Sequence, residues 1–336
     1  MIPGFVEVSQ ESPALAEAEA VSAAEALGGG GRTAATSFPN LVAVEVPDAR
    51  SWELLASRLA LGRRCLLPVA AGSDIPSSLR EQAAVGGSAA FRRIGRPSGG
   101  GADPEVLACG RAYKMGGGTI DLDRPHRRFW LVRDAGGDEH LLEESASVDR
   151  SAASRRRMPL LPFRRPVSLP PKLARAAVNL ARVRPSENVL DPFLGTGALL
   201  AEAGLVGGHL YGIDRDASMV RGALRNLSYF GLTAEELAVG DAREVDFADP
   251  TRTFSAIVTD APYGRSSSTG GEAKVELVTE VMERWSRRLT PEGRLVLVAP
   301  AAESPIPVPG TLRYRIPVRV HRSLTREFCL YERGHR

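Results

Sequence analysis

Apolar and polar residues alternate in short, regularly spaced blocks along the first seventy residues of the chain. Blocks with a period of two predict strands, and longer alanine-rich or amphipathic blocks predict helices. In chain order these are a strand at 5–9, a helix at 13–29, strands at 31–38 and 40–46, a helix at 51–61 and a strand at 63–69. This order is that of a split βαβ unit, so residues 1–71 are predicted to form a ferredoxin-like domain.

A second group of alternating elements occupies residues 72–149. The predicted elements are a helix at 75–84, a strand at 88–95, a helix at 103–115 and strands at 118–123 and 127–134. Glycine runs at 28–31, 99–101 and 116–118 punctuate both groups. Because none of these runs has the lysine and the strand–loop–helix setting of a phosphate loop, they are predicted to be ordinary loops.

The pattern changes after residue 166 to strands that alternate with helical stretches or loops. A helix is predicted at 166–181, followed by short apolar strands at 188–193, 209–214, 254–260 and 294–300 and a final pair of strands at 313–320 and 326–333. Such alternation is typical of a parallel sheet with crossover helices, here with an antiparallel end. The predicted fold class is therefore α/β, with a linker at 150–165 and a Rossmann-like domain at 166–336.

Composition excludes several classes of protein. Of the 336 residues, 43% are hydrophobic and 25% charged, and no apolar run approaches the roughly 20 residues that span a bilayer. The first ten residues lack the features of a secretory signal, so a cytoplasmic protein is expected. Cys65, Cys109 and Cys329 lie far apart without paired spacing, which predicts free buried thiols and neither a disulfide framework nor a metal site.

Positive charge is concentrated in one segment. The formal net charge is only +3, but residues 151–165 contain five arginines and no acidic residue. Such a segment suits contacts with the phosphates of a nucleic acid. A solvated linker explains it equally well, and the sequence leaves both interpretations open.

A glycine-containing loop follows the first strand of the Rossmann-like part. Gly195, Thr196 and Gly197 lie where this strand ends and a helix begins, so the backbone can approach a ligand closely. A dinucleotide would favour a third glycine, which is missing here. Asp191 stands at the strand end, where its carboxylate can bind the ammonium group of an amino-acid moiety. This combination favours S-adenosylmethionine as the cofactor.

Two further acidic residues follow the next two strands. Asp214 ends the second strand, where a carboxylate can bind both ribose hydroxyls, and Asp241, next to Ala242, follows the third, where it can accept from an adenine amino group. Each alone is equally compatible with a helix cap or a surface charge. Their order along the chain, together with Asp191 and the glycine loop, favours a cofactor site.

The fourth strand ends in the sequence Asp260-Ala261-Pro262-Tyr263. A base amino group is a poor nucleophile because its lone pair is delocalised into the ring, so a site that methylates it needs acceptors for the amino hydrogens. The Asp260 carboxylate and the Ala261 carbonyl can accept them, Pro262 restrains the backbone and Tyr263 offers a face for a flipped-out base. Taken alone, the four residues are also typical of a turn.

These motifs carry a family resemblance. The segments 191–203 and 259–267, with the helix at 166–181 and the closing segment 321–327, are similar to the THUMP-containing tRNA guanosine N2-methyltransferases of archaea and eukaryotes, which modify guanosine 10. Residues 116–132 resemble the strand pair of a THUMP domain. The family's cofactor positions fall on Asp191, Phe193, Gly195, Gly197, Asp214 and Asp241, with Thr196 and Ala242 beside them, and its amine-binding positions on Asp260, Ala261, Pro262 and Tyr263.

The resemblance implies an enzyme that binds tRNA through its front half and produces N2-methylguanosine or N2,N2-dimethylguanosine. No metal is expected, and a monomer is expected with a partner subunit left open. The family usually has proline where this chain has Ala261, so the loop loses one conformational restraint. Two alternatives remain. One is an amino-methyltransferase for another RNA site or for DNA, and the other is an RNA-binding module whose methyltransferase fold has lost its activity.

Overall fold

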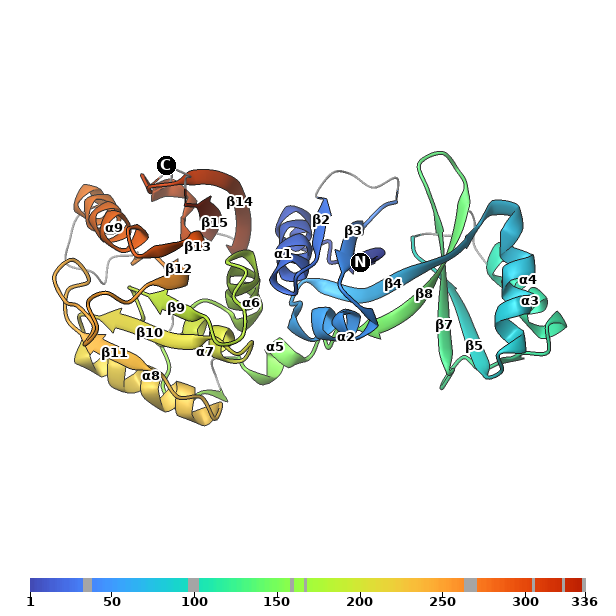
Figure 1. Ribbon diagram of the computed structural model, residues 1–336, viewed down its shortest axis with the longest axis horizontal. Coiled ribbons are helices and arrows are strands. Elements are labelled where there is room, and N and C mark those ends of the chain that lie inside the picture. The colour runs from blue at the N-terminus through green and yellow to red at the C-terminus, as the bar shows by residue number, and fades with distance from the viewer. Residues whose placement is uncertain are drawn as a thin grey trace. The chain divides into compact units, whose positions relative to one another are not determined.

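A computed structural model describes residues 1–32, 38–95, 103–157, 160–165, 168–262, 271–303, 306–321 and 324–333 of the chain. Contacts between residues divide the chain into two compact units (Figure 1). Unit 1 comprises Met1–Gln10, Gly28–Ser57 and Gly62–Asp149, and unit 2 comprises Glu11–Leu27, Arg58–Leu61 and Arg150–Arg336.

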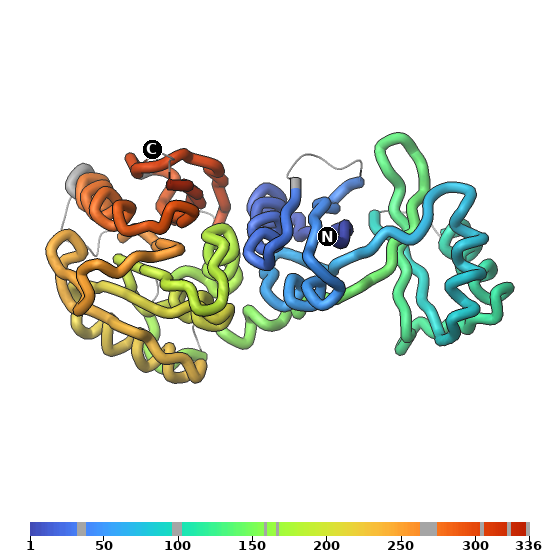
Figure 2. The backbone as a smooth tube through the Cα atoms, in the orientation of Figure 1, coloured from blue at the N-terminus to red at the C-terminus, as the bar shows by residue number. Residues whose placement is uncertain are grey.

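The sheet of unit 1 has eight strands in the order β2-β3-β1-β4-β8-β7-β5-β6. Its strands are β1 (Ile2–Val8), β2 (Gly30–Arg32), β3 (Leu41–Val46), β4 (Gly62–Ala71), β5 (Ser88–Arg93), β6 (Thr119–Ile120), β7 (Arg127–Arg133) and β8 (Glu139–Ser147). The long strand β4 pairs with β1 on one side and with β8 on the other, both antiparallel (Figure 2). A single sheet therefore contains strands from both predicted front domains.

Helices pack on this sheet through apolar side chains. In α2 (Ala49–Arg58), Trp52 is fully buried against β1 at Gly4, where a Cβ atom would come within 2.6 Å of the indole ring. The helices α3 (Ile75–Ala84) and α4 (Pro104–Met115) bury apolar side chains against β5, β7 and β8. The N-cap residue Asp103 accepts hydrogen bonds from the first turn of α4 and fixes where this helix begins.

The sheet of unit 2 has seven strands in the order β11-β10-β9-β12-β13-β15-β14. They are β9 (Asn188–Asp191), β10 (His209–Asp214), β11 (Glu236–Val239), β12 (Phe254–Asp260), β13 (Leu289–Pro300), β14 (Thr311–His321) and β15 (Leu324–Glu332). The strands β11 to β13 in this order are parallel, and β15 runs antiparallel to both β13 and β14. From β9 the chain first adds β10 and β11 on one side of the sheet and then β12 and β13 on the other side. A doubly wound sheet binds its ligands at this switch point, between β9 and β12.

Helices cover both faces of the unit 2 sheet. The elements are α5 (Ala152–Arg155), α6 (Pro171–Leu180), α7 (Ala198–Gly204), α8 (Ala217–Tyr229) and α9 (Gly271–Ser286). Figure 1 shows α8 along β10 and β11 and α9 on the opposite side of the sheet. Trp285 of α9 is fully buried among apolar residues of the parallel strands, including Leu190 and Ile257. This core holds the carboxyl ends of the strands in fixed positions.

Helix α1 (Pro13–Ala26) groups by its contacts with unit 2, where it packs against α6. Its Glu19 carboxylate is fully buried and accepts hydrogen bonds from the backbone amides of Ala60 and Leu61 and from the Asn179 amide. Arg58 also donates to Asn179, at 3.0 Å. Burial raises the pKa of Glu19, so these donors offset the cost of placing a carboxyl group inside the protein.

The structure confirms most of the predicted elements, including the antiparallel final pair and the helix at 75–84. Strand β8 was not predicted, the predicted strand at 118–123 is reduced to Thr119–Ile120, and the helix expected from residue 166 begins at Pro171. Much of the strand predicted at 31–38 and the glycine run at 99–101 lie outside the described residues. The division at residues 71, 149 and 165 stays a prediction.

Candidate functional site at the carboxyl edge of the unit 2 sheet

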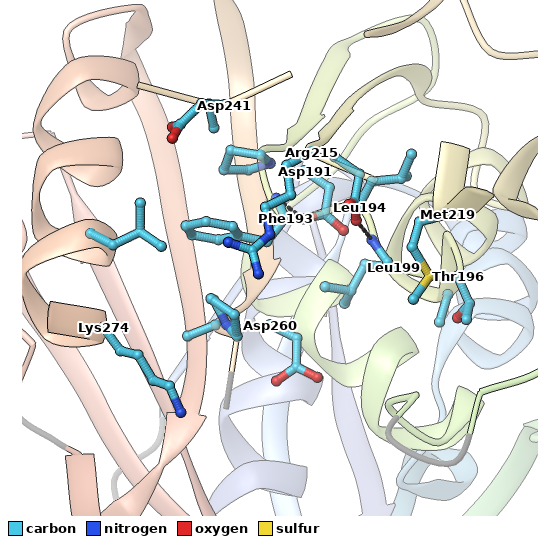
Figure 3. A pocket seen from close by; sticks show the side chains of 18 of the residues that line it. Asp191, Phe193, Leu194, Thr196, Leu199, Arg215, Met219, Asp241, Asp260 and Lys274 are labelled. Carbon is cyan, nitrogen blue, oxygen red and sulfur yellow. Dashed lines mark hydrogen bonds between the residues drawn. The ribbon is translucent and has the colours of Figure 1, made fainter. Parts of the chain in front are cut away.

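A pocket of about 550 Å³ opens at the carboxyl edge of the parallel strands in unit 2. Residues from the ends of β9, β10 and β12, from the start of α7 and from α9 line it, and ten of the lining residues are labelled in Figure 3. Of the residues predicted from the sequence, those lining it are Asp191, Phe193, Gly195, Thr196, Asp214, Asp241, Ala242, Asp260, Ala261 and Pro262. Gly197 supports the loop without lining the pocket, and Tyr263 lies outside the described residues.

The loop between β9 and α7 depends on its two glycines. Gly195 and Gly197 both have positive φ values, 52° and 76°, in the left-handed region that most side chains avoid. A Cβ atom on Gly197 would also approach that of Ala223 to 3.0 Å. The Thr196 hydroxyl forms a 2.7 Å hydrogen bond with the Ser168 hydroxyl, and the Thr196 carbonyl accepts from the Asn226 amide. These contacts fix the loop beside the pocket.

Gly197→Ala tests how far cofactor binding depends on this loop. The left-handed conformation costs an alanine about 1–2 kcal/mol, and the contact with Ala223 adds to this cost. We expect the affinity for S-adenosylmethionine, measured by isothermal titration calorimetry, to fall about tenfold. Gly231→Ala is the matched control, because Gly231 has a φ of 70° but open space around its Cβ position. Its affinity should be unchanged, and an equal loss in both variants would contradict a local role for the loop.

Asp191 is the most deeply buried acid of the pocket, with 1% of its surface exposed. One of its oxygens, Oδ1, accepts from the Phe193 amide at 3.1 Å and from the Thr259 hydroxyl at 2.7 Å. Burial, with smaller contributions from the nearby Asp260 and Asp214 carboxylates, raises the pKa of Asp191 to about 7, although the two hydrogen bonds act in the opposite direction. A positively charged ligand group beside Asp191 would relieve both penalties, because it favours the ionised form.

Asp214 ends β10 and joins the loop to this strand. Its Oδ2 accepts from the Gly195 amide at 2.9 Å, and its Oδ1 accepts from the Asp216 amide at 2.9 Å. Burial raises the pKa of Asp214, and the two amides partly offset this effect. Each oxygen keeps a further acceptor site, so the carboxylate can still bind a pair of ligand hydroxyls.

Asp241 lines the pocket, and both of its carboxylate oxygens accept hydrogen bonds from Arg243. Arg243 donates to Oδ1 through Nε at 3.0 Å and to Oδ2 through Nη2 at 2.7 Å. The same arginine holds the pKa of Asp241 below its usual range. Figure 3 shows Asp241 and Asp260 at opposite ends of the pocket, with Phe193 between them in this view. An adenine amino group would therefore share Asp241 with Arg243.

Asp260 ends β12 and pairs with a buried arginine. Its Oδ2 accepts from Nη1 of Arg326 at 2.7 Å, and Arg326 is 2% exposed. Its Oδ1 is buried and has no hydrogen-bond partner within the described part of the chain. Burial raises the pKa of Asp260 to about 7, and Arg326 acts in the opposite direction. An unsatisfied buried acceptor is costly, and in a pocket it indicates a place for a ligand donor.

Ala261 and Pro262 continue from β12 into the pocket. Ala261 is 1% exposed, and its amide donates to the Val298 carbonyl of β13 at 2.8 Å. This hydrogen bond extends the sheet by one residue and fixes the backbone that carries the Ala261 carbonyl. The neighbouring strand therefore restrains the chain at a position where the resembling family usually has proline.

Sequence reasoning missed four side chains that shape the site: Thr259, Arg215, Lys274 and Arg326. Thr259 precedes the predicted motif on an apolar strand and is itself fully buried, so a hydroxyl there was a signal for a polar partner. Lys274 of α9 lines the pocket and is only 7% exposed. Because lysine is rarely so deeply buried, this position indicates a specific role at the pocket. Arg326 lies 66 residues from Asp260, and only the pairing of β13 with β15 brings them together.

The arginines of the segment 151–165 lie in different surroundings. Arg156 donates to both carboxylate oxygens of Glu202 on α7, at 2.7 and 3.1 Å, and Arg175 donates to the same group at 2.7 Å. Arg156 therefore anchors the segment to unit 2. Arg165 lines the pocket, and Arg157 is exposed. The predicted phosphate contacts consequently concern only part of this segment and stay a prediction.

A family model for the RMKL-like methyltransferase domain matches residues 160–309, which contain the glycine loop and all four strand-end acids. The solved structure of a possible methylase from Clostridium difficile 630 covers 99% of both chains with a TM-score of 0.50 and 14% identity, which shows the same fold. Unit 2 therefore contains a methyltransferase domain whose cofactor is S-adenosylmethionine.

Curated relatives narrow the class. A protein from Methanothermococcus thermolithotrophicus named probable tRNA (guanine(10)-N2)-dimethyltransferase is 34% identical over 167 residues, which are 48% of this chain and 98% of that protein. The tRNA (guanine(10)-N2)-dimethyltransferase of Pyrococcus abyssi is 39% identical over 213 residues, 61% of this chain and 59% of that protein. The chain belongs to the tRNA (guanine(10)-N2)-dimethyltransferase family, which confirms the resemblance of its methyltransferase motifs. It aligns with about three-fifths of the Pyrococcus relative. The resemblance of residues 116–132 to a THUMP domain stays a prediction.

The described residues contain neither a membrane-spanning helix nor a metal-binding cluster. No helix among them is long and apolar enough to cross a membrane. No group of three or more histidine, cysteine, aspartate or glutamate side chains in the same part of the chain has the arrangement of a metal site. Cys65, Cys109 and Cys329 are free and buried, as the sequence predicts.

Proposed function

We propose that this protein transfers a methyl group from S-adenosylmethionine to the exocyclic N2 of guanosine in tRNA, at position 10, where its relatives are named to act. The observation that carries the proposal is the buried Oδ1 of Asp260, an acceptor that has no donor among the described residues and lies at the same pocket as the buried acid Asp191. One carboxylate suits a ligand cation and the other a ligand amine.

The residues fit the cofactor by charge. Asp191 is ionised at a cost in this buried position, and the ammonium group of the cofactor would offset that cost. The Asp214 carboxylate would bind the ribose hydroxyls, and Phe193 together with Asp241 would surround the adenine. When bound, S-adenosylmethionine supplies an electrophilic methyl group on a sulfonium.

Asp260 and Ala261 would orient the target amine. One amino hydrogen is donated to Asp260 Oδ1 and the other to the Ala261 carbonyl, which directs the nitrogen lone pair toward the methyl group. As the nitrogen–carbon bond forms and the bond from the methyl carbon to the sulfonium sulfur breaks, the neutral thioether would leave and positive charge would move to the nitrogen. The adjacent Asp260 carboxylate would stabilise this charge. The proton that the amine loses after transfer can pass to Asp260 Oδ1.

The tRNA would be bound mainly through phosphates and shape. Arg165, which lines the pocket, and the exposed Arg157 in the same segment would contact phosphates of the tRNA. A THUMP-like role for residues 72–149 in holding the tRNA is part of the same proposal. A monomeric state and a cytoplasmic location stay predictions.

Mapping of the modified nucleoside tests the proposal. Purified protein, labelled S-adenosylmethionine and an unmodified tRNA transcript should yield N2-methylguanosine or N2,N2-dimethylguanosine at position 10, detected by mass spectrometry of nuclease fragments. A transcript with adenosine at position 10 is the control and should stay unmodified. Methylation of a different nucleotide, of DNA only, or of nothing would contradict the proposal and favour one of the alternative interpretations.

A further inference from the structure

Arg326 of β15 is a buried cation at the edge of the pocket. It is 2% exposed, which is unusual for arginine, and it reaches the Asp260 carboxylate through one nitrogen, Nη1, at 2.7 Å from Oδ2. A bidentate pair would occupy both oxygens, but here Oδ1 keeps its acceptor sites. The two oxygens of Asp260 therefore differ: Oδ2 is bound by Arg326, and Oδ1 has no partner among the described residues.

The sheet topology explains how a residue near the end of the chain reaches this site. In the paired strands, Asp260 of β12 lies opposite Val298 of β13, which lies opposite Phe328 of β15. Arg326 is two residues from Phe328 and opposite Pro300, so it lies nearer the carboxyl edge than Asp260. Because β15 is antiparallel, its first residues come to the edge where the parallel strands end. Only a long side chain can cross β13 from there.

We propose that Arg326 is a positioning residue for methyl transfer: it holds Asp260 Oδ2 so that Oδ1 alone faces the target amine. This inference rests on the proposed function, because it assigns Oδ1 to the amine. Without Arg326 the carboxylate is free to rotate about its terminal bond, and the lone pair of the amine loses its orientation. The fixed rotation also keeps Asp260 Oδ2 from competing for the amino hydrogens.

Arg326 has a second effect through charge. The pKa of Asp260 is raised to about 7 because burial raises it more strongly than Arg326 lowers it. The other charged groups at this end of the pocket are Asp191 of β9, whose own pKa responds to Asp260, and Lys274 of α9. Loss of Arg326 therefore raises the pKa of Asp260 and leaves it protonated at neutral pH, where it accepts the amino hydrogen poorly.

Kinetics of Arg326→Gln and Arg326→Lys test the proposal with the full-length protein. For Arg326→Gln we expect kcat on the tRNA transcript to fall about a hundredfold while the KM for tRNA and the affinity for S-adenosylmethionine stay within about threefold. The acidic limb of its pH–rate profile should move up by about one unit. Arg326→Lys should recover part of kcat, because it restores a cation. Arg315→Gln is the matched control, since Arg315 pairs with Glu327 and lies outside the pocket.

A double variant and a titration without substrate complete the test. If Arg326 acts through Asp260, then Asp260→Asn combined with Arg326→Gln should be no slower than Asp260→Asn alone. An NMR titration of ¹³C-labelled aspartate should show a higher pKa for Asp260 in Arg326→Gln, whether or not tRNA is the substrate. An unchanged pKa, a wild-type kcat or multiplicative losses in the double variant would overturn the inference. A wild-type protein that methylates no tRNA would instead overturn the proposed function.

Discussion

Asp260→Asn is expected to reduce the rate of methyl transfer to tRNA at least about a hundredfold, which is the scale observed when one acceptor or donor of a transition state is removed. The asparagine keeps the size of the side chain but loses the negative charge opposite the amine nitrogen. Cofactor affinity should change little, because Asp191 and Asp214 are untouched. The loss should therefore appear in the rate constant of methyl transfer, measured in single-turnover experiments at saturating S-adenosylmethionine.

The variant also leaves Arg326 without its carboxylate partner, so some loss of stability is expected. Rates are therefore normalised to the concentration of cofactor-binding sites, measured by titration on the same sample. Asp249→Asn is the control, because Asp249 pairs with its near neighbours Thr251 and Arg252 and does not line the pocket. Turnover of Asp260→Asn close to that of the wild type would refute the assignment of Asp260 to the amine.

The pH dependence of the wild-type enzyme follows from the same carboxylate. Since burial raises the pKa of Asp260 to about 7, the group is protonated below this pH and ionised above it. The Asp191 carboxyl group titrates in the same range and interacts with Asp260, so the pair shares its proton uptake. Both groups are needed in the ionised form, and methyl transfer therefore decreases as the pH falls through about 7.

Local patterns in the sequence were sufficient to predict the residues that follow strands. Asp191, Asp214 and Asp260 each end an apolar strand, and a parallel sheet places such ends at one edge regardless of the loops between them. The pattern also predicted the glycine loop, because left-handed backbone and close packing both exclude side chains at Gly197. Because these features depend on a few neighbouring residues, they can be predicted from the sequence alone.

Strand β8 could not be predicted because its sequence does not alternate clearly. Residues 139–147 read EHLLEESAS, and their polar positions are satisfied by partners distant in sequence. Glu143 pairs with Arg127 of β7, and Glu144 accepts from the Trp130 indole at 2.9 Å. A strand with paired charges on its surface resembles a loop until its partners are known. The Arg326–Asp260 ion pair was missed for the same reason.

The placement of α1 has a similar origin. Its alanine-rich sequence predicts a helix, and ten of its fourteen residues are buried, so no exposed face indicates what it packs against. Glu19 is the distinguishing residue, since its carboxylate is satisfied only by the amides of Ala60 and Leu61 and by Asn179 of α6. These contacts span up to 160 positions of the chain, beyond any local pattern.

Asp191→Asn is expected to change stability and cofactor affinity in opposite directions. Both hydrogen bonds to Asp191 end on Oδ1, and the amide oxygen of asparagine can accept them both. The substitution therefore removes a buried negative charge without removing an acceptor. The affinity for S-adenosylmethionine should fall at least about tenfold, because the ammonium group loses its counter-charge. The free energy of unfolding of the protein without cofactor should rise by on the order of 2 kcal/mol at pH 8.

The stability gained by Asp191→Asn depends on pH. The pKa of Asp191 is about 7 in the folded protein and near 4 in the unfolded chain, so the folded state binds the additional proton between these values. Ionisation of Asp191 therefore opposes folding, slightly at pH 5 and fully above pH 7. The stability gained by Asp191→Asn, measured by urea unfolding, should grow from pH 5 to pH 8. Asp249→Asn is the control and should lose the same small amount of stability at pH 5 and at pH 8, because hydrogen bonds from Thr251 lower the pKa of Asp249 and its charge favours folding throughout this range. If Asp191→Asn lost stability and kept its cofactor affinity, Asp191 would be a structural acid, and the ammonium group would have to bind elsewhere in the pocket.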